Sequence, residues 1–156
     1  MAATRTAGRA LRRGWQLLLL WALSGSLVLA MPAIQHWQTA NGARVYFVPA
    51  PELPMVDARM VFAAGSARDA EQPGLARMTN LLHKQGAAGL SADEFAIRLV
   101  SLGAELGTGS LRDMAWVSLR SLSDAEHLQP ALDIYRDVVS RPDFNKQDME
   151  RERERT

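Results

Sequence analysis

The sequence predicts a fold that mixes β-strands and α-helices, and three observations carry this prediction. Asn41-Gly42 lies between two apolar-leaning runs. This pair is typical of a β-hairpin, because a type I′ turn needs two positive φ values, which Asn and Gly tolerate. Ser91 and Glu94 have the spacing of a helix capping box. Apolar residues recur at three- and four-residue spacing between 124 and 140, which indicates an amphipathic helix.

Four strands are expected, each a short apolar or alternating run bounded by turn residues. The fourth is apolar on both faces near its centre, as for a strand that is covered on at least one side. The predicted ranges are 35–39, 43–49, 56–63 and 114–120.

Four helices are expected after the third strand. Gly86 is interpreted as the stop signal of the first helix, Ser123 with Glu126 as a capping box for the third, and Asn145 as the cap of the fourth. The first three cover residues 74–84, 92–102 and 124–140. The third is expected to bury a face made of Leu128, Leu132, Tyr135 and Val139.

Residues 1–30 have the pattern of a secretory signal peptide. Four arginines and no acidic residue precede an apolar run that starts at Trp15, and Val28-Leu29-Ala30 closes it with small-residue cleavage chemistry. Cleavage is expected after Ala30, which leaves one domain over residues 31–156; the alternative is an uncleaved N-terminal anchor. The chain has no cysteine, so neither lipid attachment to a thiol nor thiol catalysis is available.

The charge balance changes once the signal segment is set aside. Without its four arginines, 14 basic side chains face 17 acidic ones, so the net charge falls from +1 to −3. No basic, aromatic-rich face is visible in the remainder, and the sequence therefore gives no indication of nucleic-acid binding.

The histidines do not form a metal-binding pattern. His36, His83 and His127 are far apart, and none has a second histidine or a carboxylate at helical ligand spacing. Zinc needs three or four convergent donors. No metal is therefore expected in this chain, and no phosphate-binding loop, nucleophile elbow or acid/base carboxylate pair is visible either.

Residues 74–82 read Gly-Leu-Ala-Arg-Met-Thr-Asn-Leu-Leu. This stretch resembles the Gly-Leu-Ala-His-x-x-Glu-His zinc motif of the insulinase, pitrilysin and mitochondrial-processing-peptidase family, with Arg77, Asn80 and Leu81 in place of His, Glu and His. Other segments resemble the family in the same order. These are residues 39–45, 61–69, 91–94 with 102–106, and 141–144 running into 150–153.

The substitutions remove the chemistry of the motif. Arg77 stays protonated and cannot ligate a cation, Leu81 has no donor atom, and Asn80 cannot accept a proton from a zinc-bound water. The family's third zinc ligand maps two positions beyond Thr156. The resemblance therefore implies a non-catalytic member with a mitochondrial-processing-peptidase-like α+β fold, of which these residues are the N-terminal part. One hypothesis is that Arg77 takes the place of the cation and pairs with the remaining acids.

The resemblance also implies a role. Inactive members pair with a zinc-bearing paralogous subunit and help to form the peptide-binding chamber, so zinc is expected in the partner rather than in this chain. Active members bind substrate along an edge strand by strand addition. The resemblance to this edge strand implies four candidate substrate-binding residues, Ala104, Glu105, Leu106 and Gly107. The expected location is the bacterial periplasm, with membrane contact only through the signal segment before cleavage.

Two alternatives remain open. The protein could be an active metalloendopeptidase whose site lies elsewhere in a longer chain, which an intact His-x-x-Glu-His in a continuation would indicate. It could also be a scaffold or interaction protein of the cell envelope with no role in proteolysis. A neighbouring gene encoding an intact motif would favour the non-catalytic subunit over the scaffold.

Overall fold

The computed structural model describes residues 33–155, so the expected signal peptide lies outside the described part. The chain divides into two compact units, residues 1–50 and residues 51–156. The described part of the first unit is an antiparallel hairpin of β1 (Gln35–Gln38) and β2 (Arg44–Phe47). No helix in the described residues is long and apolar enough to cross a membrane.

The predicted hairpin is confirmed, but its turn differs from the predicted type I′. Gly42 has a φ of 88°, whereas Asn41 does not take positive φ. The amide of Gly42 donates to the carbonyl of Thr39, and the Thr39 hydroxyl accepts a hydrogen bond from the amide of Ala43. The threonine side chain thus closes the loop, so a single positive φ at the glycine is sufficient.

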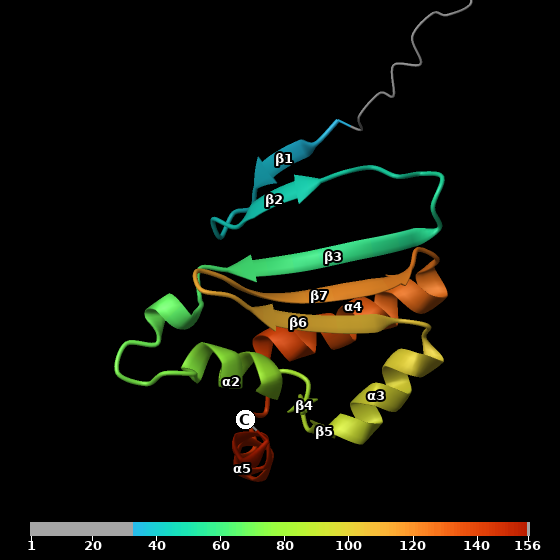
Figure 1. Ribbon diagram of the computed structural model, residues 1–156. Coiled ribbons are helices and arrows are strands. Elements are labelled where there is room, and N and C mark those ends of the chain that lie inside the picture. The colour runs from blue at the N-terminus through green and yellow to red at the C-terminus, as the bar shows by residue number, and fades with distance from the viewer. Residues whose placement is uncertain (1–32, 156) are drawn as a thin grey trace, which may run out of the picture. The chain divides into compact units, whose positions relative to one another are not determined.

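The second unit is built on a three-stranded antiparallel sheet in the order β3-β7-β6 (Figure 1). Its strands are β3 (Met55–Phe62), β6 (Glu105–Ser110) and β7 (Ala115–Leu122). The central strand β7 buries Val117, Leu119 and Ser121 on one face. This agrees with the apolar centre predicted for this strand, although the strand begins and ends later than expected.

Helix α4 (Ala125–Ser140) covers the buried face of β7 (Figure 1). The hydroxyl of Tyr135 donates to the carbonyl of Val117 at 2.9 Å, and burial raises the pKa of this phenol. The hydrogen bond satisfies a buried polar group in an otherwise apolar contact. The cluster around it comprises Ala87, Phe95, Leu99, Ala104, Val117, Leu119, Ala131, Ile134, Tyr135 and Val138.

The predicted cap and buried face of α4 are partly wrong. Asp124, not Ser123, caps the helix and accepts a hydrogen bond from the amide of His127. The buried positions are Ala131, Ile134, Tyr135 and Val138, whereas Leu128, Leu132 and Val139 are only partly buried. The helix meets the sheet through a face rotated from the predicted one, and the small Ala131 on this face is fully buried.

A two-stranded hairpin of β4 (Gly86–Ala87) and β5 (Leu90–Ser91) precedes α3 (Ala92–Ser101). The predicted capping box of Ser91 and Glu94 is confirmed, and the pKa of Glu94 is lowered by the backbone amide and hydroxyl of Ser91. Gly86 is not a helix stop, because it lies in β4 with a φ of 154°. A Cβ at this position would lie 2.8 Å from the carbonyl oxygen of Leu90.

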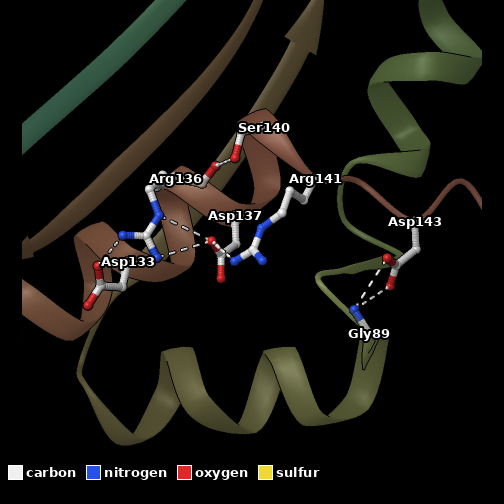
Figure 2. Close-up of polar contacts among 7 residues, drawn as sticks. All are labelled: Gly89, Asp133, Arg136, Asp137, Ser140, Arg141 and Asp143. Atoms are coloured by element: carbon white, nitrogen blue, oxygen red, sulfur yellow. Dashed lines mark hydrogen bonds and ion pairs between the residues drawn. The ribbon is translucent and has the colours of Figure 1, made fainter.

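The segment after α4 holds this small hairpin in place. The carboxylate of Asp143 accepts from the amide of Gly89 at 3.1 Å, as Figure 2 shows. The amide of Ala88 donates to the carbonyl of Arg141, and the amide of Asp143 donates to that of Gly86. Residues 141–144, identified from the sequence only as a segment resembling the family, therefore tie two distant parts of the chain together.

Candidate functional site

The helix that carries the degenerate motif is α2 (Leu75–Leu82), shorter at both ends than predicted. It follows a 3-10 turn, η1 (Ser66–Arg68). Gly65 lies so close to the loop between β6 and β7 that a Cβ there would be 2.6 Å from the carbonyl oxygen of Leu111. The amide of Ser66 donates to that same oxygen at 3.0 Å. Gly65 and Ser66 thus hold the start of the segment that leads to α2 against the loop between β6 and β7.

Asp69 anchors the N-terminus of α2. Its carboxylate, which is 7% exposed, accepts hydrogen bonds of 2.9 Å from the amides of Gly74 and Ala76. These amides have no partner inside the helix, and a negative charge is favourable at a helix N-terminus. Asp69 is the last residue of the segment 61–69, which resembles the family. Sequence reasoning missed its capping role because the carboxylate reaches forward from a loop rather than from the N-cap position.

Arg77 and Leu81 line the same groove, one helical turn apart on α2. The opposite wall is α5 (Lys146–Glu154), which packs against α2 in Figure 1. We call this space, about 690 Å³ in volume, the α2–α5 groove. Its lining includes Leu75, Arg77, Met78 and Leu81 from α2 and Lys146, Met149, Glu150 and Arg153 from α5.

Arg77 is exposed, and within residues 33–155 it forms no hydrogen bond or ion pair. The hypothesis that it pairs with the remaining acids of the site is therefore not supported. Glu150, the acid on the facing wall, lies 3.9 Å from Lys146 instead. The guanidinium of Arg77 remains available at the groove.

Asn80 points away from this groove and into the fold. It is 7% exposed, and its side-chain amide donates to the carbonyl of Trp116 in β7 at 3.3 Å. It lines a separate, largely apolar pocket of about 350 Å³ together with Asp69, Ala76 and Trp116. The motif positions thus have two different surroundings. Arg77 and Leu81 face α5, whereas Asn80 joins α2 to the sheet through its hydrogen bond to β7.

Helix α5 is attached through the side opposite the groove. The buried carboxylate of Glu152 accepts from Gln85 at 3.0 Å and from Arg155 at 3.2 Å. The cap by Asn145 is confirmed, since its side chain accepts from the amide of Gln147. Among the described residues, Arg153 forms no ion pair, although it lies three residues after Glu150.

The motif residues do not fit a zinc ion. A guanidinium and a leucine side chain provide no lone pair at 77 and 81, and the Asn80 amide is engaged with the sheet. Nor do residues 33–155 contain a group of three or more His, Asp or Glu side chains that could hold a metal. His83, at the end of α2, contacts the Thr79 carbonyl through Nδ1 at 2.8 Å and the Phe144 ring edge-on.

The candidate substrate-binding residues lie at the start of β6. Ala104 is buried just before the strand, Glu105 is exposed, and Leu106 and Gly107 are partly buried. Within the described sheet, β6 is paired only with β7, so it is an edge strand. Helix α2 packs beside it. The structure therefore brings the candidate peptide-binding strand and the motif helix into contact.

Two glycines shape the face of β6 and β7 that points away from α4. Gly109 lies opposite Trp116, and a Cβ there would come within 2.0 Å of the indole ring. Gly107 similarly leaves room for the hydroxyl of Ser118. The guanidinium of Arg59 lies 5.7 Å from the Trp116 ring centroid, within the range of a cation–π contact. The glycines thus allow the indole to lie over the strand.

A charged pair, Arg120 and Asp57, lies at the other end of this face. Arg120 donates two hydrogen bonds to the carboxylate of Asp57, at 2.7 and 3.0 Å. The side-chain hydrogen bond from Arg120 holds the pKa of Asp57 below its usual value. Since both side chains are exposed, we interpret this pair as a surface ion pair and not Asp57 as a catalytic acid.

Comparison with solved structures places this arrangement among known folds. The chain is similar to an inactive domain of peptidase family M16 from Pseudomonas fluorescens, with 43% sequence identity and a TM-score of 0.76 over 78% of this chain and 30% of that one. It shares its fold with a protease from Helicobacter pylori, with 17% identity and a TM-score of 0.68, over 80% of this chain and 30% of that one. The chain thus spans about a third of the length of either protein.

No curated protein matches the sequence, but a family model does. The family model of insulinase, peptidase family M16, matches residues 44–156, which comprise β2 and the whole second unit. Together with the degenerate motif on α2 and the α+β arrangement around it, this match shows that the chain belongs to the insulinase family of peptidases, family M16, as a homologue of an inactive domain.

Proposed function

We propose that this protein is the non-catalytic subunit of an exported zinc peptidase, and that it helps a zinc-bearing paralogue to hold peptides. The observation that carries the proposal is the division of the motif positions. Arg77 and Leu81 line the α2–α5 groove and neither side chain can ligate a metal, while the Asn80 amide joins α2 to β7. The scaffold of the family is thus retained around positions that cannot perform hydrolysis.

Similarity to an inactive family M16 domain supports the non-catalytic part of the proposal. The peptide-binding part is supported by β6, an edge strand beside α2 whose free edge can add an extended peptide as a further strand. The export part is supported by the arginines, apolar run and small-residue end of residues 1–30. The partner would supply the zinc ion and its ligands.

Metal analysis tests the non-catalytic assignment. The purified protein, freed of partner and dialysed against a weak chelator, is expected to hold close to no zinc. A stoichiometric zinc content would instead favour the active-peptidase alternative, and the protein would then be assayed as a peptidase by itself.

Reconstitution tests the role of the subunit. Adding the protein to its zinc-bearing paralogue should increase cleavage of an unstructured peptide, whereas neither chain alone should reach that rate. Backbone N-methylation of the peptide should abolish its binding to this subunit, because strand addition requires backbone hydrogen bonds. If the paralogue is fully active alone and this protein binds no peptide, the scaffold alternative is favoured.

A further inference from the structure

We propose that the α2–α5 groove is an anion-selective peptide subsite, in which Arg77 and Arg153 bind carboxylate side chains of a peptide. This inference rests on the proposed function and adds the chemical class of the peptide. It assigns Arg77, a position of the degenerate motif, a role in binding in place of zinc ligation.

The charges of the groove are unbalanced. Three cationic side chains, Arg77, Lys146 and Arg153, line it with one acid, Glu150. Lys146 and Glu150 lie 3.9 Å apart, within salt-bridge distance of one another. Within residues 33–155, neither of the two arginines has an ion-pair partner. Two guanidiniums from different helices are thus left to bind an anion.

The remaining surface of the groove favours a peptide over a nucleic acid. Met78 and Leu81 from α2 and Met149 from α5 make its lining largely apolar. Methionine side chains adapt to varied apolar partners. Nucleic-acid sites instead combine extended cationic surface with aromatic rings on which bases stack. A segment that alternates acidic and bulky apolar side chains matches both the charges and the apolar lining.

The two helices that form the walls of the groove are held by side chains that do not line it. Asp69 and Asn80 hold α2, and Glu152 with Gln85 holds α5. Because none of these bonds uses Arg77 or Arg153, the two arginines can meet a ligand without loss of a contact that supports the fold. The guanidinium fork is also suited to bidentate binding of carboxylates.

The proposal can be tested by fluorescence anisotropy with the purified protein and three labelled peptides of one length. One alternates Glu with Leu, the second alternates Gln with Leu, and the third alternates Lys with Leu. The acidic peptide is expected to bind about tenfold more tightly than the neutral one, as two partly exposed ion pairs would provide. This preference should decline as the salt concentration rises.

Charge-changing variants locate the subsite. The double variant Arg77→Gln with Arg153→Gln should bind the acidic and neutral peptides equally. Arg77→Glu with Arg153→Glu should prefer the lysine peptide, a gain that misfolding cannot produce. Arg98→Gln is the matched control, because Arg98 is an exposed arginine on α3 outside the groove. This control should retain the wild-type preference.

The outcomes separate this proposal from the function on which it rests. If the neutral and acidic peptides bind equally to the wild-type protein, the subsite is overturned while peptide binding by the subunit stands. The same conclusion follows if the double Gln variant keeps its preference. If none of the three peptides binds, both the subsite and the peptide-holding role are overturned.

Discussion

The side-chain amide of Asn80 donates to the carbonyl of Trp116, and this bond joins the motif helix to the central strand of the sheet. The motif of active family members has a Glu at this position, whereas here an Asn side chain occupies it and forms part of the fold. Asn in place of Glu therefore provides a neutral side chain that makes a structural hydrogen bond and cannot accept a proton from a zinc-bound water.

Asn80→Ala is expected to lower the free energy of unfolding by about 1–3 kcal/mol, because it removes a hydrogen bond from a buried position. Arg77→Ala, one turn earlier on the same helix, should change it by less than about 0.5 kcal/mol, since Arg77 is exposed. Urea unfolding measures both. Equal effects of the two variants would contradict the division of the motif positions.

Asp69→Ala should destabilise the protein by about 1–2 kcal/mol, because two amides at the start of α2 lose their acceptor. Glu71→Ala changes an exposed acid in the same loop and serves as the control. Thermal unfolding followed by circular dichroism compares them. A melting temperature of the Asp69 variant equal to that of the control would show that the carboxylate does not anchor the helix.

Gly109→Ala should cost about 1–3 kcal/mol, because the added methyl group would overlap the Trp116 ring. The indole must then leave its position beside Arg59. In a Trp116→Ala background the same change at position 109 should be nearly neutral. A double-mutant cycle in urea measures this coupling, and simple additivity of the two substitutions would rule out the ring contact as the cause.

Asp143→Ala should lower stability by about 1 kcal/mol and speed amide hydrogen exchange at Gly89, whose amide donates to this carboxylate (Figure 2). Asp113→Ala, at an exposed acid outside this contact, is the control. Exchange is followed by NMR. Unchanged protection at Gly89 would mean that the β4–β5 hairpin is held by its backbone contacts alone.

His127 should titrate at a higher pH than an unpaired histidine, because the side-chain hydrogen bond to Asp124 raises its pKa and lowers that of the aspartate. The stabilisation of the folded state by His127 is fully present below the pKa that this histidine has in the unfolded chain. It is lost as the pH rises through the raised pKa of the folded state. The contribution from Asp124 is lost as the pH falls through its lowered folded pKa. The pair therefore stabilises α4 between these limits.

NMR titration checks this pair with Asp124→Asn, which keeps an N-cap side chain but removes its charge. The pKa of His127 should fall in this variant. If the imidazole titrates at the same pH in both proteins, the contact with Asp124 is absent in solution.

Most elements of the fold could be predicted because their signals are local. The Asn-Gly turn, the capping box at Ser91 and the Asn145 cap all depend on residues within a few positions of one another. The β4–β5 hairpin could not be predicted, because it is held by Arg141 and Asp143, more than fifty residues away. The buried face of α4 also differs from the predicted one, because packing on β7, rather than local apolarity, selects Ala131 and Val138.

The residue types at positions 77, 80 and 81 are enough to exclude zinc chemistry at the motif, since the presence of donor atoms is a property of each side chain alone. The tertiary structure decided how those side chains are used instead. It turns Asn80 inward to β7 and places Arg77 across a groove from α5. The reason is that hydrogen-bond partners and the balance of charge depend on which segments meet in space, and α2, β7 and α5 are distant along the chain.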